Sequence, residues 1–131
     1  MSALGHYMQD LAEAMDVTFQ SSEGVYSLEM PTPGGRTQIV NATLHESGLG
    51  GEMVLFRTLV GALTDDVDCK GLLELNVGTI YARVGIMEGQ IVVVAGQLLD
   101  SAEVSEVITI LSEVGTLGDL LEQLLYGEDK Y

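Results

Sequence analysis

The sequence has little positive charge. Five lysines and arginines stand against 20 aspartates and glutamates, which gives a formal net charge of −15 over 131 residues. A surface of this charge repels nucleic-acid phosphates and anionic membranes, so neither is an expected partner. The same surface favours solubility and would attract a basic partner.

The sequence is also poor in cysteine and in long apolar runs. The single cysteine, Cys69, excludes an internal disulfide and a cysteine-based zinc site, and it fits a reducing compartment. No apolar run reaches the roughly 18 residues that a membrane span needs. No basic region followed by an apolar one stands at the start, so no secretion signal is expected. We therefore expect a cytoplasmic protein.

Hydrophobic residues make up 47% of the chain, enough for an ordinary core. A chain of this length is expected to form one domain over residues 1–131 and to bury about two-thirds of its unfolded surface. Residues 127–131 are expected to be a frayed polar tail.

The first half of the chain predicts one helix followed by strands. Leu4, Met8 and Leu11 share one face of an amphipathic helix expected over residues 2–15. Residues 17–20 are interpreted as an extended lead-in and residues 21–24 as a turn. Turn residues then separate three expected strands, over residues 25–30, 36–45 and 53–63. A glycine-rich loop is expected over residues 46–51.

The third of these strands is apolar on both faces, with Leu55 and Leu59 alternating with Phe56 and Val60. Near-continuous apolarity is typical of a strand that is covered on both sides. One of the two covers is expected to come from another chain.

The stretch from residue 64 to residue 98 predicts a short helix and a hairpin. Thr64 is expected to cap the helix, with three aspartates in its first turn, and the helix should end near Asn76. Ile80, Ala82, Val84 and Ile86 alternate with polar or larger residues, which predicts a strand. Glu88-Gly89 is a two-residue turn signal before a return strand over residues 90–98. So short a helix is poorly stable alone and is a first indication of a partner chain.

The last element is a helix with an apolar stripe running from Val104 to Leu124. Asp100 and Glu103 resemble a capping box at its start. Gly115 and Gly118 each weaken a helix by roughly 1 kcal/mol relative to alanine, which predicts a kink or a break between them.

These elements predict an α+β fold in the order helix–three strands–helix–two strands–helix. Short turns between neighbouring strands imply a twisted antiparallel sheet, packed by the two terminal helices.

Several stretches in this order resemble the type III secretion chaperone-like family (Tir chaperone or CesT-like, class I). They are the opening helix ending in LAEAMDV, the strand MVLFRTLVGAL running into TDDVD, LLELN before IYARV, and QLLD followed by SAEVSEV. The resemblance extends from Leu4 to about Leu125. The related YbjN-like proteins share the fold and occur where no secretion machinery is involved.

The resemblance implies a homodimer that keeps an extended segment of a client protein competent for secretion. In that family the middle helix and the following strand build much of the dimer contact, which implies an interface containing Leu72, Leu73, Leu75, Ile80 and Ala82. Apolar patches on the first helix and the sheet would take the client's side chains. The candidates for that surface are Leu4, Met8, Val25 and Leu28.

No residue pattern indicates catalysis, a metal or a cofactor, so a non-enzymatic binding protein is expected. The aspartates at 65, 66 and 68 are interpreted as helix-cap residues rather than cation ligands. Both histidines lack a metal-ligand spacing, and Cys69 is interpreted as a buried or interface thiol. Arg57 and Arg83 either pair with a carboxylate within the sheet, which is the favoured interpretation, or anchor an acidic group of a partner. The alternative function is a YbjN-like regulatory or adaptor protein without an export client.

Overall fold

The computed structural model of the protein describes residues 2–46, 48 and 51–127. Much of the expected glycine-rich loop, and the polar tail after Gly127, lie outside the described residues. The elements are α1 (Ala3–Met15), β1 (Phe19–Ser22), β2 (Val25–Thr32), β3 (Arg36–Glu46), β4 (Glu52–Ala62), α2 (Cys69–Leu75), β5 (Arg83–Met87), β6 (Gln90–Leu98) and α3 (Val104–Tyr126).

All the strands join one antiparallel sheet in the order β1-β2-β3-β4-β6-β5. The expected α+β class and antiparallel pairing are therefore confirmed. The expected element order is wrong by one strand, because β1 pairs with β2 and four strands precede α2. The turn that joins β1 to β2 is Glu23-Gly24 alone, and both residues have positive φ angles of 49° and 80°. Such a two-residue turn suits the twist of a tight hairpin.

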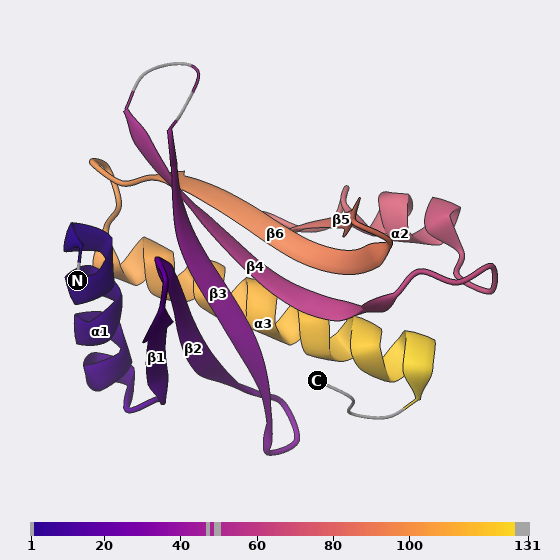
Figure 1. Ribbon diagram of the computed structural model, residues 1–131. Helices are drawn as coiled ribbons and strands as arrows, with labels where there is room; N and C mark the ends of the chain where they lie inside the picture. Colours follow the sequence, from indigo (N-terminus) through magenta and orange to yellow (C-terminus); the bar gives the residue numbers. More distant parts are fainter. Residues whose placement is uncertain (1, 47, 49–50, 128–131) are drawn as a thin grey trace.

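The helices α1 and α3 lie on one side of the sheet (Figure 1). α3 crosses β2, β3, β4 and β6, and α1 lies against β1 and β2. The core forms between these layers, and its fully buried side chains include Leu4, Met8, Leu28, Val40, Phe56, Ile91, Ile110, Leu111 and Leu121. Alternate strand residues supply the sheet's contribution, as the period of two requires.

The expected break in α3 is wrong, because α3 is one continuous helix of 23 residues. Its two inner glycines face the sheet at close range. A β-carbon on Gly115 would lie 3.2 Å from the Met30 Cβ atom, and one on Gly118 would overlap the Thr58 Cγ2 atom. The glycines therefore let the helix axis approach the strands, and packing against the sheet outweighs their low helix propensity.

A salt bridge fixes α3 to the start of β3. The Arg36 Nη2 atom donates to the Asp119 Oδ2 atom at 2.8 Å, and Arg36 Nε donates to Asp119 Oδ1 at 3.1 Å. This two-point geometry is the strongest form of a carboxylate–guanidinium contact. Because the Asp119 carboxylate is buried, it needs such a partner.

Two expected helix caps are wrong. Asp68, not Thr64, caps α2, and its Oδ1 atom accepts a hydrogen bond from the Gly71 amide at 3.1 Å. The chain between Thr64 and Asp68 instead forms a turn closed by a bond from the Val67 amide to the Thr64 carbonyl. α3 begins after Glu103, whose side chain makes no capping bond, so the proposed capping box does not form.

Candidate functional site

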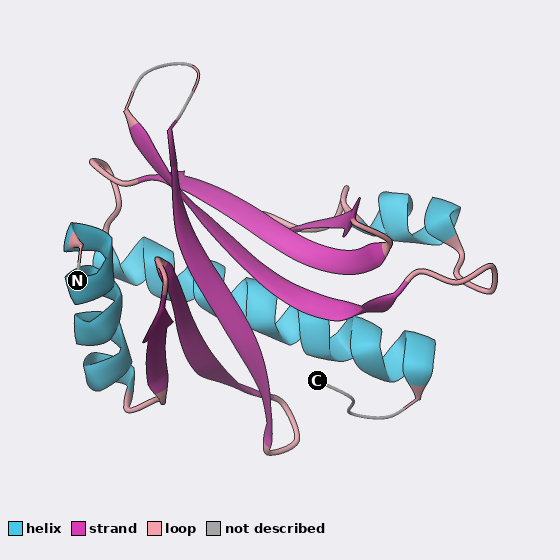
Figure 2. Cartoon of the chain, viewed as in Figure 1, coloured by secondary structure: helices cyan, strands magenta, loops and turns pink. Residues whose placement is uncertain are grey.

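The short helix α2 lies beside β5, the last strand at one edge of the sheet (Figures 1 and 2). The Asn76 side chain joins the two elements. Its Nδ2 atom donates to the Val84 carbonyl at 3.2 Å, and its Oδ1 atom accepts from the Val84 amide at 2.7 Å. The amide group therefore occupies the outer edge of β5 as a neighbouring strand would, and holds the end of α2 in place.

The segment between α2 and β5 is held against α3. The Glu113 Oε1 atom accepts hydrogen bonds from the Tyr81 amide at 2.9 Å and from the Ala82 amide at 2.7 Å. The strand that the sequence predicts from Ile80 therefore begins only at Arg83, because the backbone before it bonds to a side chain rather than to a strand. This anchor leaves Ile80 at the surface, 75% exposed.

The structure divides the five residues expected at a dimer interface into two groups. Leu73, Leu75 and Ile80 are exposed, whereas Leu72 and Ala82 are buried in the core of their own chain. Leu72 and Ala82 are therefore not surface residues in this structure. Leu72 is on the side of α2 that faces β5, and Ala82 is drawn inward by the bond to Glu113.

Two further apolar residues belong to the exposed group and were missed from the sequence. Val77 is 89% exposed and Ile86 is 54% exposed. We call these five exposed residues, Leu73, Leu75, Val77, Ile80 and Ile86, the α2 patch. Single exposed leucines are ordinary, but five large exposed apolar side chains within 14 residues of sequence make this corner a candidate interaction surface. The position of Val77 predicts its exposure, because it lies between polar residues and glycine just after the helix.

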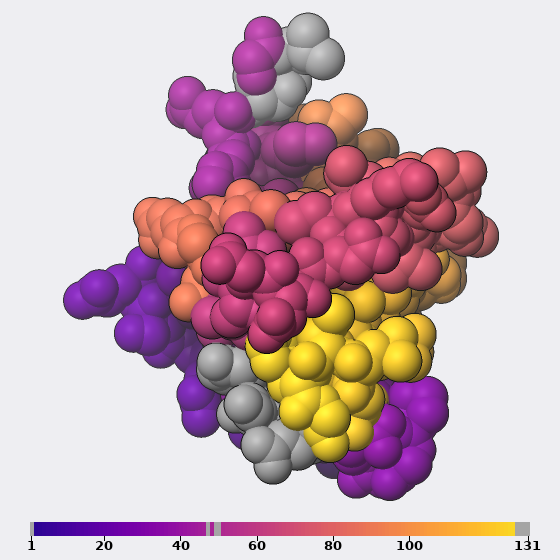
Figure 3. Space-filling view, turned by 90° about the vertical axis from the view of Figure 1, so that its right-hand side faces the viewer, coloured from indigo at the N-terminus to yellow at the C-terminus, as the bar shows by residue number. Residues whose placement is uncertain are grey.

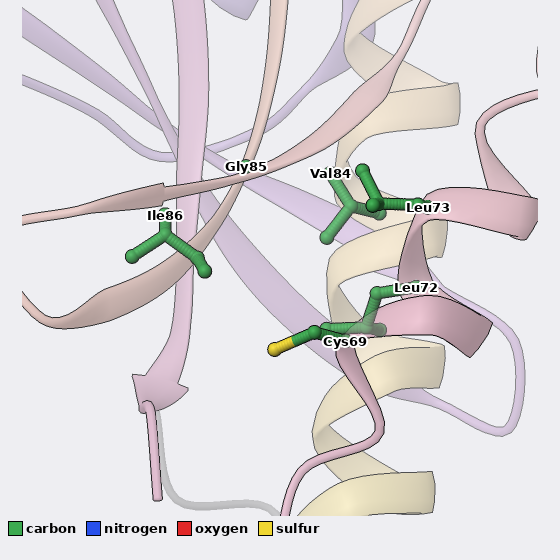
Figure 4. A pocket seen from close by; sticks show the side chains of 6 residues that line it. All are labelled: Cys69, Leu72, Leu73, Val84, Gly85 and Ile86. Carbon is green, nitrogen blue, oxygen red and sulfur yellow. The ribbon is translucent and has the colours of Figure 1, made fainter.

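An apolar pocket opens between α2 and β5 (Figure 4). Its volume is about 140 Å³, and its lining consists of Cys69, Leu72, Leu73, Val84, Gly85 and Ile86. Apolar cavities of about 150 Å³ accept a benzene-sized group. The pocket can therefore take one apolar side chain of a partner. Cys69, expected to be a buried or interface thiol, is exposed at this pocket.

The segment made of α2 and residues 76–80 also borders α3 (Figure 3). A shallow groove of about 530 Å³ runs between them, with Ile80 on one side and Leu117 and Leu120 on the other. Leu120 is 49% exposed and Leu124, one turn further, is 69% exposed. The apolar surface thus continues from the α2 patch onto α3.

The four residues expected to form a client surface lie elsewhere. Leu4, Met8 and Leu28 are at most 1% exposed, and Val25 is half-buried. The first three fill the space between α1 and the sheet, so they do not form a binding surface in this structure. The apolar stripe of α1 packs on its own sheet rather than facing outward.

The side of the sheet away from α1 and α3 carries no helix within the described part of the chain (Figure 1). We call it the open face. Register and alternation place on it an apolar set that comprises Val25, Ile39, Met53, Leu55, Leu59, Met87, Val92, Val94 and Leu98. The sequence predicts that β4 is covered on both sides. In this structure α3 covers one side of β4, and no described helix of the chain covers the other.

Arg57 and Arg83 both lie on the open face. Arg57 pairs in register with Val94 on β6, and Val94 pairs with Arg83 on β5. Neither arginine forms an ion pair with a carboxylate of the described residues, so the favoured internal pair is wrong there. Arg57 Nη1 instead lies 3.6 Å from the Met87 sulfur, and Arg83 Nη1 donates to the Ala82 carbonyl and the Thr79 hydroxyl.

The remaining polar candidates do not converge. Within residues 2–46, 48 and 51–127, no group of three or more histidine, cysteine or acidic side chains is placed to hold a metal ion. His45 contacts the Thr43 hydroxyl at 2.9 Å. Burial raises the pKa of the Tyr7 hydroxyl above its ordinary value of 10.0.

Comparison with protein-family models and with curated proteins found no match to this chain. Among the described helices, none combines the length and the apolar character required to cross a membrane.

Proposed function

We propose that the protein is a non-catalytic, homodimeric chaperone or escort that binds an extended segment of a client protein in the cytoplasm. The observation that carries this proposal is the α2 patch, with its adjoining pocket and groove. Covering the apolar segments of a client would lower the client's tendency to aggregate. Binding of this kind depends on surface burial rather than on bond-making chemistry.

The α2 patch supports self-association for an energetic reason. Burying an exposed leucine, isoleucine or valine contributes roughly 1.5–3 kcal/mol, so a contact that covers several of them can hold two protomers together. Two residues of the patch, Leu73 and Ile86, line a pocket large enough for one apolar side chain. A two-fold contact would place an apolar residue of each protomer in the pocket of the other, and one surface would serve both protomers.

Replacing Leu73 with aspartate tests the dimer. The side chain is 67% exposed, so the variant should fold as the parent does, but a dimer would then bury an unpaired charge at a cost of several kcal/mol. We expect the dimer to dissociate at micromolar concentration, as measured by size-exclusion chromatography with light scattering.

Val104→Asp is the matched control. Val104 is 52% exposed and is the first residue of α3, at the end of that helix that lies far from α2. A carboxylate is favourable at the N-terminus of a helix, so the substitution should not disturb α3. This variant should keep the parent's mass. A parent that is monomeric, or a Leu73→Asp variant that stays dimeric and folded, would contradict the proposed interface.

Client binding is tested by co-purification from the native cell. An exported or aggregation-prone protein that is retained by the parent supports the chaperone function. A dimer that retains only regulatory or assembly partners supports the alternative, a YbjN-like adaptor on the same scaffold.

A further inference from the structure

The open face has a charge balance opposite to that of the whole chain. Acidic residues outnumber basic ones by 20 to 5 in the sequence. Among the described strand residues, register and alternation place two arginines on the open face, Arg57 and Arg83, and one carboxylate, Glu29. Glu29 is on β2, two strands away from Arg57. The open face is therefore the one strand surface on which cations prevail.

The two arginines form a row across three neighbouring strands. Because adjacent strands lie about 4.8 Å apart, the Cα atoms of Arg57 and Arg83 are about 10 Å apart with Val94 between them. The contact between Arg57 Nη1 and the Met87 sulfur spans β6, since β6 lies between β4 and β5. Val92 lies between those positions on β6 and is only 4% exposed. The side chains of Arg57 and Met87 thus meet over β6.

Apolar side chains flank this row. Ile39, Leu59 and Leu98 are 51%, 38% and 44% exposed. A hollow of about 470 Å³ opens beside Arg57, between the β1–β2 turn and the end of β3, and His45 and Thr43 also line it. Glu23 lies at its rim. The surface therefore offers charged hydrogen-bond donors beside exposed apolar side chains, and bonds from such donors to a carboxylate are stronger than bonds between neutral groups.

We propose that the open face binds an extended segment in which acidic and apolar side chains alternate on one side, with carboxylates held by Arg57 and Arg83. This proposal rests on the proposed protein-binding function and specifies the chemistry of the client. An extended chain presents every second side chain to a surface, and positions four residues apart are about 13 Å apart. Two carboxylates at that spacing can reach both guanidinium groups, while the apolar side chain between them covers Val94.

A synthetic probe tests the proposal with the full chain. The probe is a fluorescein-labelled peptide of sequence Leu-Thr-Glu-Thr-Val-Thr-Glu-Thr-Leu, and its binding is followed by fluorescence anisotropy. We expect binding that weakens roughly tenfold when both glutamates become glutamine, and that weakens further when they become lysine. Binding should also fall as salt increases, because the charges are at the surface.

Two arginine variants locate the site. Arg57→Gln and Arg83→Gln should each weaken the glutamate peptide several-fold and leave the glutamine peptide nearly unchanged. Lys70→Gln is the matched control, because Lys70 is a solvent-exposed cation on α2 that lies near Glu74 and off the open face. It should bind as the parent does. Thermal unfolding of each variant separates lost binding from lost folding.

Failure of this proposal is distinguishable from failure of the proposed function. Absence of probe binding, equal binding of the three peptides, or an unchanged affinity in both arginine variants would overturn the acidic-segment assignment. The dimer and any co-purified client would then still stand. A lower molecular mass of Arg57→Gln by light scattering would show that a second copy of this chain covers the open face, and would also overturn the assignment.

Discussion

The two faces of β4 carry the same kind of side chain, but one face is buried in the core and the other is left open. Phe56 and Val60 point into the layer beneath α3 and are at most 1% exposed, whereas their neighbours Leu55 and Leu59 point to the open face. Sequence alone does not separate the two sets, since both are apolar and alternate along one strand. What separates them is the long helix that returns over one side of the sheet. An apolar strand face therefore indicates burial only where the chain supplies a cover.

The largest expected effect tests the covered face against the open one. Phe56→Ala should lower the free energy of unfolding by about 3–5 kcal/mol, because it leaves a cavity between α3 and the sheet. Leu59→Ala, three residues along the same strand, should cost less than about 1 kcal/mol if the open face is solvent-exposed in the isolated protein. Urea unfolding measures both variants at the same protein concentration. Equal losses would contradict the contrast and would mean that another surface already covers Leu59.

A smaller change in stability is expected when a glycine on each side of the sheet is replaced by alanine. Gly118→Ala places a methyl group against the Thr58 side chain, and overpacking costs about 1–3 kcal/mol, which exceeds the gain in helix propensity. Gly85→Ala is the matched change on β5, where a β-carbon meets nothing within 4 Å. It should be neutral or stabilise by less than about 1 kcal/mol. Thermal unfolding distinguishes them, and a Gly118→Ala variant as stable as the parent would show that α3 can move away from the sheet.

The smallest effect concerns Tyr7 on α1. Its buried hydroxyl has no hydrogen-bond partner in the described part of the chain, so Tyr7→Phe should change stability at pH 7 by less than about 1 kcal/mol. The pKa of Tyr7 in the folded state is raised above 10.0, its ordinary value in the unfolded chain. The protonated hydroxyl therefore contributes its full stabilisation below pH 10.0, and this contribution is lost as the pH rises through the pKa of the folded state. Between pH 9 and 11, the free energy of unfolding measured in urea should therefore fall less steeply with pH for Tyr7→Phe than for the parent. Parallel curves would contradict a buried hydroxyl.

Much of the fold was predictable because apolar periodicity is local information. The helix near the start, the hairpin after Met87 and the stripe of α3 follow directly from spacing. β1 was missed although Glu23-Gly24 is the same dipeptide as the correctly identified turn Glu88-Gly89. The strand before Glu23 is short and polar, and its burial pattern has no alternation. Its place in the sheet comes from β2 rather than from its own sequence.

The candidate site was predictable only in part. Leu73, Leu75 and Ile80 lie on the α2 patch, as a surface role requires, whereas Leu72 and Ala82 do not. Which side of a seven-residue helix faces its own sheet depends on the contacts of Asn76 and Glu113, which join residues 8 and 31 positions apart. Spacing along the chain does not reveal contacts of that kind. For the same reason the sequence does not reveal that Leu4 and Met8, the two client-surface candidates on α1, are buried against the sheet.

The side-chain amide of Asn76 has a consequence for the growth of the sheet. An open edge strand is a template on which further strands, from any chain, can add without limit. By occupying the Val84 amide and carbonyl, Asn76 withdraws these main-chain groups of β5 from that reaction. At Val84 a further strand would therefore meet a side-chain amide that already fills the ladder positions, and sheet growth cannot start there without displacing it.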